Sequence, residues 1–197
     1  MLPDGSCGAN DTDTWAEHAG DIDYNIKNKC CRRLNGGSWG ALSYSTSAQS
    51  TMAYLLDESG DGPDHYAKYI ELLVKAVAQY PNAVGIETMN EPPVAPVELY
   101  PSNTTGLFKL YKKIYERVRK ISKDMALSVQ HPGQIVPDVE EITTVGLTDG
   151  LTEWLKSATG LFYTWHCYGC AMDDDIEAAT AFSKEFGGMP QLLTEYP

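Results

Sequence analysis

The sequence is poor in positive charge: 15 lysine and arginine residues stand against 27 aspartate and glutamate residues, and the net charge is −12. Nucleic-acid binding needs a basic surface, so this balance argues against that class of protein. No run of about eighteen apolar residues occurs either, so we expect no membrane span. An acidic surface is compatible with a neutral partner, such as a sugar. It is equally compatible with a charge whose only effect is to keep the protein soluble.

Cysteine is also scarce, with five residues at positions 7, 30, 31, 167 and 170. An odd number cannot pair completely within one chain. A structural zinc site needs four tetrahedral ligands, and the chain has a single Cys-x-x-Cys pair, Cys167 with Cys170. We therefore predict no metal, while a disulfide and buried thiols both stay open for these cysteines.

The chain can still form a core, because 43% of its 197 residues are hydrophobic. Residues 1–60 are rich in Gly, Ser, Asp, Asn and Thr, and we expect long loops there. A stretch this long without regular structure also suggests that neighbouring chain is missing. We interpret 1–197 as a single domain with a loop-rich part, 1–62, and an ordered part, 63–197.

From residue 63 onward, apolar periodicity and turn residues predict alternating helices and strands. The predicted helices cover residues 63–79, 104–123, 152–157 and 174–186, and the predicted strands cover 83–89, 126–130, 161–168 and 190–195. The strands are short and continuously apolar, which is typical of a parallel sheet covered by helices. The expected fold class is therefore α/β.

Polar side chains stand at the carboxyl ends of all four predicted strands. They are Asn90, Glu91, Gln130, His131, His166, Tyr168 and Glu195. In a parallel α/β sheet the functional site lies at this edge. Chance would scatter such residues over both ends of the strands, so we favour a site.

Strand parity predicts how some of these side chains point, because residues two apart share a face. His166 and Tyr168 should point together, with Cys167 turned toward the helices. Glu87 should share the face of Glu91 and lie deeper in the sheet. A buried carboxylate needs a partner, so we interpret Glu87 as a structural residue.

Glu91 and Glu195 each end a short apolar run. Two carboxylates presented at strand ends are what the cleavage of a glycosidic bond by double displacement requires. A residue before a proline avoids the helical region, so Pro92 predicts an extended Glu91 with a fixed carboxylate direction. Asn90 should then turn aside unless the strand bends.

Three segments together resemble glycoside hydrolase family five, the cellulase family with a (β/α)8 TIM barrel. Gly-Ile-Glu-Thr-Met-Asn-Glu-Pro at 85–92 resembles the family's fourth-strand signature. Trp-His-Cys-Tyr at 165–168 resembles its His-x-Tyr motif on strand six, and Leu-Thr-Glu-Tyr at 193–196 resembles its nucleophile segment on strand seven. The resemblance covers about residues 63 to 197, which would be barrel units four to seven.

The resemblance implies a retaining mechanism with a role for each residue. Glu91 would be the general acid and base, and Glu195 would be the nucleophile that forms a covalent glycosyl-enzyme. Asn90 would hydrogen-bond the sugar 2-hydroxyl. Tyr168 would orient the nucleophile, and His166 would bind substrate near the cleavage point. The two carboxyl groups should then lie about 5–5.5 Å apart.

The resemblance also implies an incomplete TIM barrel. A complete barrel takes about 250 residues, and no segment here matches the family's first two strands or its aromatic platform after strand eight, so about half to five-eighths of the barrel would be present. We expect the isolated 197 residues to be inactive or to aggregate.

The expected activity is hydrolysis of a β-linked polysaccharide, such as cellulose or another β-glucan, without a cofactor. The expected protein is monomeric in its complete form and secreted, a route that the sequons at 10–12 and 103–105 fit. Four aromatic residues could stack on a sugar, namely Trp39, Trp154, Trp165 and Tyr196, and Trp39 is the best candidate. Two alternatives stay open: a non-catalytic carbohydrate-binding relic of the same barrel, and an unrelated α/β barrel enzyme with coincidental motifs.

Overall fold

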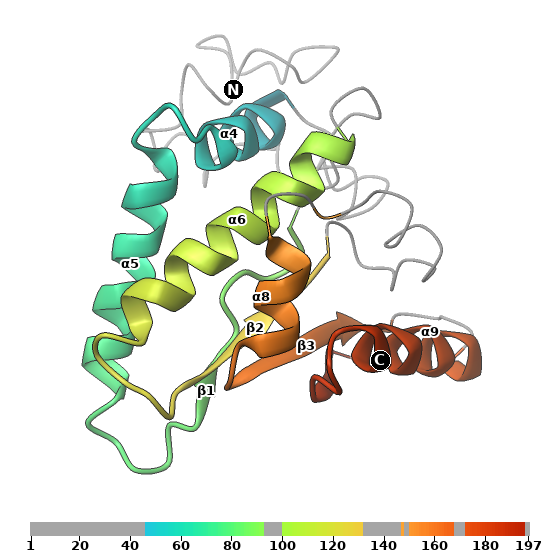
Figure 1. The fold of residues 1–197 in the computed structure, drawn as a ribbon. Coiled ribbons are helices and arrows are strands. Elements are labelled where there is room, and N and C mark those ends of the chain that lie inside the picture. The colour runs from blue at the N-terminus through green and yellow to red at the C-terminus, as the bar shows by residue number, and fades with distance from the viewer. Residues whose placement is uncertain (1–45, 93–99, 132–146, 148–149, 168–171, 196–197) are drawn as a thin grey trace, which may run out of the picture.

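The computed structural model describes residues 46–92, 100–131, 147, 150–167 and 172–195 (Figure 1). The elements follow in the order α4 (Thr46–Leu56), α5 (Gly62–Val77), β1 (Gly85–Ile86), α6 (Tyr100–Val118), β2 (Ala126–Val129), α8 (Leu151–Ser157), β3 (Leu161–His166), α9 (Met172–Glu185) and β4 (Gln191–Glu195). At least one helix stands between each of these strands and the next. The predicted alternation of strands and helices is confirmed.

The four strands form one parallel sheet in the order β1-β2-β3-β4. The sheet curls strongly, as one hydrogen bond shows: the Thr194 hydroxyl of β4 donates to the Glu87 carboxylate just after β1, at 3.2 Å. In a flat sheet the outer strands of four would lie about 14 Å apart, at about 4.8 Å a step, which is too far for that contact. Consecutive βα units around a curled parallel sheet form an incomplete (β/α)8 barrel, as predicted.

The helices bury one face against the sheet and against one another. In α5 the buried side chains include Ala67, Ile70 and Val74, at helical spacing. The buried face of α6 is longer and comprises Leu107, Phe108, Leu110, Tyr111, Ile114 and Val118. Figure 1 shows α4, α5 and α6 packed together, with α8 in front of β2 and β3.

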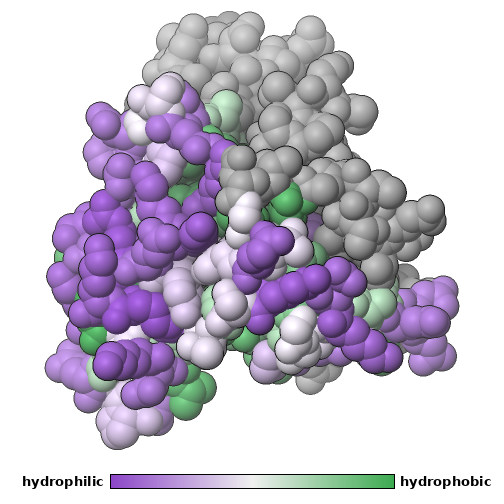
Figure 2. Space-filling view, viewed as in Figure 1, coloured by the Kyte–Doolittle hydropathy of each residue, from purple (hydrophilic) through white to green (hydrophobic). Residues whose placement is uncertain are grey.

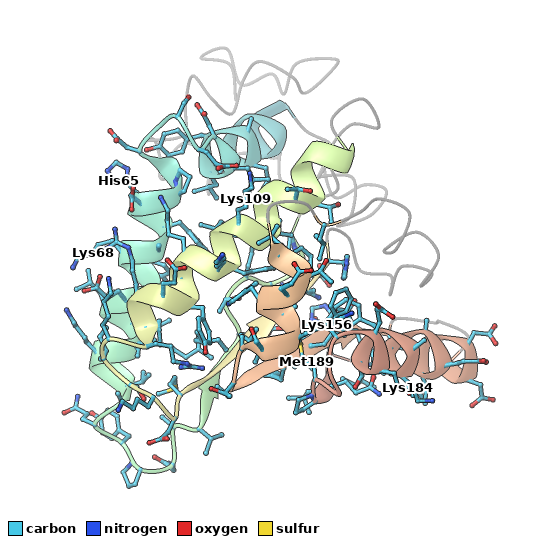
Figure 3. The ribbon with its side chains drawn as sticks, in the orientation of Figure 1. His65, Lys68, Lys109, Lys156, Lys184 and Met189 are labelled. Atoms are coloured by element: carbon cyan, nitrogen blue, oxygen red, sulfur yellow. The ribbon has the colours of Figure 1, made fainter. Side chains whose placement is uncertain are left out.

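The opposite faces of α5 and α6 are charged. Hydrophilic residues dominate this side of the molecule in Figure 2, and His65 and Lys68 project outward from α5 in Figure 3. Arg117 of α6 bridges to Asp64 of α5 at 2.6 Å and to Glu71 of α5 at 3.2 Å. Ion pairs with lysines and with Arg117 lower the pKa of Glu71 to about 2, chiefly through Lys75. This charged face marks the side of the fold that meets water.

Strand β1 is shorter than predicted, since it covers Gly85–Ile86 instead of 83–89. The reason is a side-chain pairing that replaces the backbone ladder. The Thr88 amide donates to the Ser128 hydroxyl at 2.8 Å, and the Thr88 hydroxyl donates to the Ser128 carbonyl at 2.6 Å. The segment after β1 therefore follows β2 without regular strand pairing.

Two helices also differ from the prediction. Helix α4 lies within residues 1–60, where we expected loops. Its first half is polar and shows no apolar periodicity that would predict a helix. Met52 is buried and the helix packs on α5 and α6, so tertiary contacts stabilise a helix that the local sequence does not predict. Helix α6 covers Tyr100–Val118 and not 104–123, because the chain turns at Arg119, whose guanidinium binds the Met125 carbonyl at 2.8 Å. The division of 1–197 into two parts stays a prediction.

Candidate active site

Glu91 follows β1 in a loop, and its backbone is held in an unusual conformation. Its φ angle is 42°, in the left-handed region that non-glycine residues rarely adopt. The predicted extended conformation before Pro92 is therefore wrong. The Glu91 amide donates to the side-chain oxygen of Gln130 at 3.0 Å, and this contact with the end of β2 overrides the local preference. Strained backbone of this kind clusters at functional sites.

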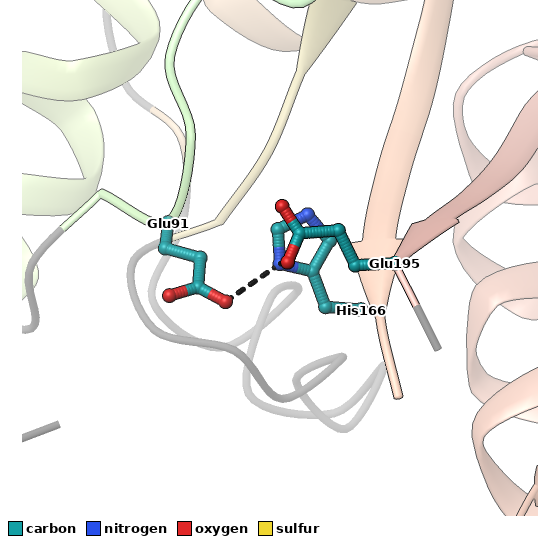
Figure 4. Close-up of side chains that lie close together, drawn as sticks. All are labelled: Glu91, His166 and Glu195. Atoms are coloured by element: carbon teal, nitrogen blue, oxygen red, sulfur yellow. Dashed lines mark hydrogen bonds and ion pairs between the residues drawn. The ribbon is translucent and has the colours of Figure 1, made fainter. Parts of the chain in front are cut away.

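The Glu91 carboxylate meets His166 and Glu195, which end β3 and β4 (Figure 4). The shortest distance joins Glu91 Oε1 to His166 Nδ1 at 2.7 Å. Glu195 Oε2 lies 3.8 Å from the same nitrogen. The imidazole is fully buried, the Glu91 side chain is 10% exposed, and the Glu195 side chain is 37% exposed. Three predicted site residues thus converge from three segments, with the more open carboxylate on β4.

The two carboxylates are close to each other. One donor atom each from Glu91, His166 and Glu195 lies within 4.8 Å of the other two. A separation above about 10 Å would have excluded both known geometries of glycoside hydrolysis. The same three donors could instead hold one divalent metal ion. Carboxylate oxygen and imidazole nitrogen suit zinc, so the residue types alone permit either use.

Glu195 reaches this position through an irregularity in β4. The register runs from Trp165–Leu193 to His166–Glu195, which leaves Thr194 as an extra residue on β4. A bulge of this kind turns the side chains next to it. Beyond the bulge, the Cys167 amide donates to the Glu195 carbonyl at 2.9 Å, so the segment after β3 pairs again with β4. Cys167 is itself buried and disulfide-bonded.

Glu87 has the partner that its depth in the sheet requires. Its Oε1 accepts the Thr194 hydroxyl at 3.2 Å and lies 3.7 Å from His166 Nε2. The side chain is 28% exposed, so it is less buried than the strand pattern implies. Glu87 and Glu91 therefore approach the same imidazole, Glu87 at Nε2 and Glu91 at Nδ1.

The remaining predicted site residues stand apart from this cluster or outside the described residues. Asn90 is exposed, next to Glu91 in the loop. Tyr168 lies outside the described residues, as do the sugar-stacking candidates Trp39 and Tyr196. Their predicted roles stay predictions.

Two other tryptophans are packed into the fold. Trp165 on β3 is 5% exposed and belongs to the core. Trp154 on α8 is half-buried and makes an edge-on contact with Tyr115, with ring centroids 5.8 Å apart. Both positions are typical of packing residues.

His131 does not join the site, although it follows β2 directly. It is 3% exposed and packs among the rings of Phe108, Tyr163 and Phe182. Burial lowers its pKa from 6.5 to about 3, so the ring is neutral in the folded protein. A position at a strand end therefore does not by itself place His131 in the site, since its ring packs against Phe108 of α6 and Phe182 of α9.

Two tyrosines from the helices hold the strand ends in place. Tyr66 of α5 donates to the Thr88 carbonyl at 2.9 Å, and Tyr111 of α6 donates to the Gln130 carbonyl at 3.0 Å. Burial raises the pKa of Tyr66 to about 12 and raises that of Tyr111 as well. Sequence periodicity identifies both tyrosines as inner-face residues, but nothing in the sequence signals these two hydrogen bonds.

A separate hollow lies among the helices. It has a volume of about 400 Å³ and is lined by Leu56, Glu58, Pro63, Gly106, Lys109, Leu110, Lys112, Lys113, Glu116 and Leu151. None of these is a predicted site residue. We place the candidate site at the glutamates, because two carboxylates and an imidazole meet there at the strand ends.

Comparisons with known proteins bear on the fold. No protein-family model matches the sequence, and no curated protein matches it. Among solved structures, the chain is similar to endo-glycoceramidase II from Rhodococcus sp. as its lactosyl-enzyme intermediate, with 20% sequence identity and a TM-score of 0.57. The match covers 80% of this chain and 38% of that protein's chain, so this chain corresponds to less than half of its length. The similarity establishes a shared barrel architecture.

No helix in the described part of the chain is both long and apolar enough to cross a membrane.

Proposed function

We propose that this chain carries the catalytic centre of an enzyme that hydrolyses β-glycosidic bonds with net retention. The observation that supports the proposal most is the approach of Glu91 and Glu195, whose nearest donor oxygens lie within 4.8 Å. Retaining glycosidases hold their carboxyl groups about 5–5.5 Å apart, whereas inverting enzymes need about 6.5–9.5 Å to admit a water. An oxygen–oxygen distance of no more than 4.8 Å supports the closer of the two arrangements, the retaining one.

In the first step the Glu195 carboxylate attacks the anomeric carbon of the sugar. The bond between this carbon and the leaving oxygen breaks, and Glu91 gives its proton to that oxygen. Glu195 suits the nucleophile's role because it is the more exposed carboxylate, at 37%. Glu91 suits the acid's role because it is largely buried, at 10%, and a buried environment favours the protonated form.

In the second step a water molecule attacks the same carbon and displaces Glu195. Glu91, now a carboxylate, accepts the proton of that water, so the enzyme returns to its starting state. His166 lies within hydrogen-bond distance of Glu91 and would hold its carboxylate toward Glu195 between the two steps. Its expected contact with the substrate near the cleavage point stays a prediction. Asn90 would bind the 2-hydroxyl, and Tyr168 would orient the nucleophile.

The proposed substrate is a β-linked polysaccharide or oligosaccharide, such as a β-glucan. Support for a sugar comes from the carboxylate pair and from the barrel architecture. The similar solved structure is a lactosyl-enzyme intermediate, a covalent species of the kind that this mechanism requires. The acidic composition agrees with a neutral substrate. We further propose that the protein is secreted.

Covalent labelling tests the reaction. The protein produced from its complete gene is treated with a 2,4-dinitrophenyl 2-deoxy-2-fluoro-β-glucoside, and the labelled peptide is identified by mass spectrometry. We expect one sugar per protein, attached to Glu195, and no label on the Glu195→Gln variant. Glu91→Gln should still be labelled, since this leaving group needs no acid, but it should hydrolyse unactivated β-glucosides about 10²–10⁴-fold more slowly.

Glu177→Gln is the matched control, because it changes an exposed glutamate of α9 in the same way. A protein that binds an oligosaccharide but is never labelled would be the carbohydrate-binding relic. A protein that neither binds nor is labelled would favour an unrelated enzyme, and the catalytic proposal would then be abandoned.

A further inference from the structure

Glu87 has contacts that a purely structural carboxylate would not need. Its Oε1 meets the Thr194 hydroxyl at 3.2 Å and His166 Nε2 at 3.7 Å. We propose that Glu87 is a positioning residue that sets the relative placement of Glu91 and Glu195 through Thr194 and His166. The inference rests on the proposed function, because it assigns Glu87 a part in that reaction.

The first argument is that Glu87 ties the two catalytic segments together directly. Glu87 precedes Glu91 by four residues in the segment after β1, and Thr194 precedes Glu195 by one residue in β4. β2 and β3 lie between these segments in the sheet. The hydrogen bond between Glu87 and Thr194 therefore joins the segment after β1 to β4 directly, without passing through β2 and β3. Its Thr194 end is one residue away from the proposed nucleophile, Glu195.

The second argument is that Thr194 lies where the regular pairing between β4 and β3 is interrupted. It is the extra residue between the register pairs Trp165–Leu193 and His166–Glu195. A bulge frees the backbone to turn and so decides the direction of the next side chain. A hydrogen bond that fixes Thr194 therefore also restricts the direction of Glu195.

The third argument concerns the imidazole between the carboxylates. Glu87 faces His166 Nε2, while Nδ1 lies 2.7 Å from Glu91 and 3.8 Å from Glu195. The proton position on one ring nitrogen is set by the partner of the other. A carboxylate beside Nε2 thus orients the ring that contacts Glu91, much as outer carboxylates orient histidines that bind metals.

Two variants separate these connections. Glu87→Gln has nearly the same shape and keeps an oxygen that can accept the Thr194 bond, but it removes the charge beside His166. Thr194→Val keeps the branched shape and removes the hydroxyl. Both are prepared in the protein from its complete gene, with Glu177→Gln as the exposed control, and folding is checked by circular dichroism.

The first measurement is the rate of covalent labelling by the 2-fluoro-glucoside. We expect Glu87→Gln and Thr194→Val each to be labelled about 10–100-fold more slowly, by analogy with the loss seen when the hydrogen-bond partners of metal ligands are removed. Glu87→Ala, which breaks both connections, should not be slowed further by Thr194→Val, because the Thr194 hydroxyl then has no Glu87 oxygen to bind. A purely structural role predicts independent losses that multiply.

The second measurement does not depend on activity. In protein labelled with ¹⁵N-histidine, the His166 ring nitrogens are assigned by comparison with His166→Gln and then recorded in each variant. We expect Glu87→Gln to shift the Nε2 resonance and Glu177→Gln to leave it unchanged.

The outcomes distinguish the two proposals. An unlabelled wild-type protein would remove the glycosidase assignment, and the nitrogen spectra would still decide whether Glu87 orients His166. A labelled wild type whose Glu87→Gln and Thr194→Val variants react at the normal rate, with unchanged nitrogen resonances, would overturn the role of Glu87 alone. If Glu87→Gln fails to fold, Thr194→Val decides by its labelling rate.

Discussion

His131 shows how its surroundings determine the chemistry of one residue. Its ring lies 5.0 Å from Phe108 and 5.2 Å from Phe182 between centroids, and its Nδ1 is 3.3 Å from the Tyr163 hydroxyl. Burial lowers its pKa to about 3. The folded protein therefore keeps the ring neutral at pH values where an unfolded chain, with a histidine pKa of about 6.5, takes up a proton.

This difference makes stability depend on pH. Because the unfolded state binds a proton that the folded state does not, the free energy of unfolding falls as the pH drops from about 6.5 toward 3. His131→Phe removes the titrating group and suits the aromatic surroundings. We expect the loss of unfolding free energy between pH 7 and pH 5 to be about 2 kcal/mol smaller in this variant than in the wild type.

Urea denaturation at the two pH values measures the effect. Leu72→Phe serves as the control, since it places a phenylalanine at an exposed position of α5 and removes no titrating group. Equal pH dependence in wild type and His131→Phe would show that His131 is protonated in the folded protein, and its assignment as a neutral core residue would then be wrong.

Single residues mark the limits of what the sequence could show. The sequence could predict that Glu91, Glu195 and His166 lie close together, because they end apolar runs and such ends meet at one edge of a parallel sheet. The φ of Glu91 was missed because Gln130, which holds its amide, is 39 residues away. The sequence indicated no partner for His131, because its contacts with Phe108 and Phe182 come from helices distant in the chain.

At the scale of elements, the close approach of α4 and α5 depends on a glycine. Gly62 begins α5, and a Cβ at this position would overlap the backbone carbonyl of Tyr54 in α4. Backbone atoms cannot rotate away as a side chain can. The junction between the two helices therefore requires a residue without a side chain.

We expect Gly62→Ala to lower the free energy of unfolding by about 1–3 kcal/mol, the usual cost of forcing extra atoms into packed structure. Urea denaturation provides the measurement. Gly60→Ala is the control, because the nearest atom to its Cβ is a side-chain oxygen of Asp57 at 3.3 Å, which can move. Equal stability of the two variants would mean that α4 does not pack on α5 as described.

Helix faces were easier to predict from the sequence than strand lengths or registers. The buried side of α6 follows from its apolar spacing, which is information within one segment. The end of β1 is set by the bonds between Thr88 and Ser128, and the extra residue Thr194 exists only in relation to β3. Such relations join distant segments, and no local pattern contains them.

At the scale of the whole molecule, the curl of the sheet is what creates the site. Glu91 belongs to the segment after β1, and Glu195 belongs to β4, the strand farthest from β1 among the four described. A flat sheet would leave the two about 14 Å apart, at about 4.8 Å for each strand. The curl brings their nearest donor oxygens within 4.8 Å. The barrel architecture thus fixes a distance that neither segment could set alone.

This distance predicts the stereochemistry of the proposed reaction. We expect hydrolysis of an aryl β-cellobioside to release the β-anomer first, with the α-anomer appearing only at the rate of spontaneous mutarotation. Proton NMR of the anomeric signals in the first minutes makes the measurement, with β-cellobiose in buffer as the reference for mutarotation. Initial release of the α-anomer would require a water between the carboxylates, and hence a separation of about 6.5–9.5 Å. That result would mean that the working barrel is wider than the described one and that Glu195 is a base, because a carboxylate this close to the acid leaves no room for the water that inversion needs.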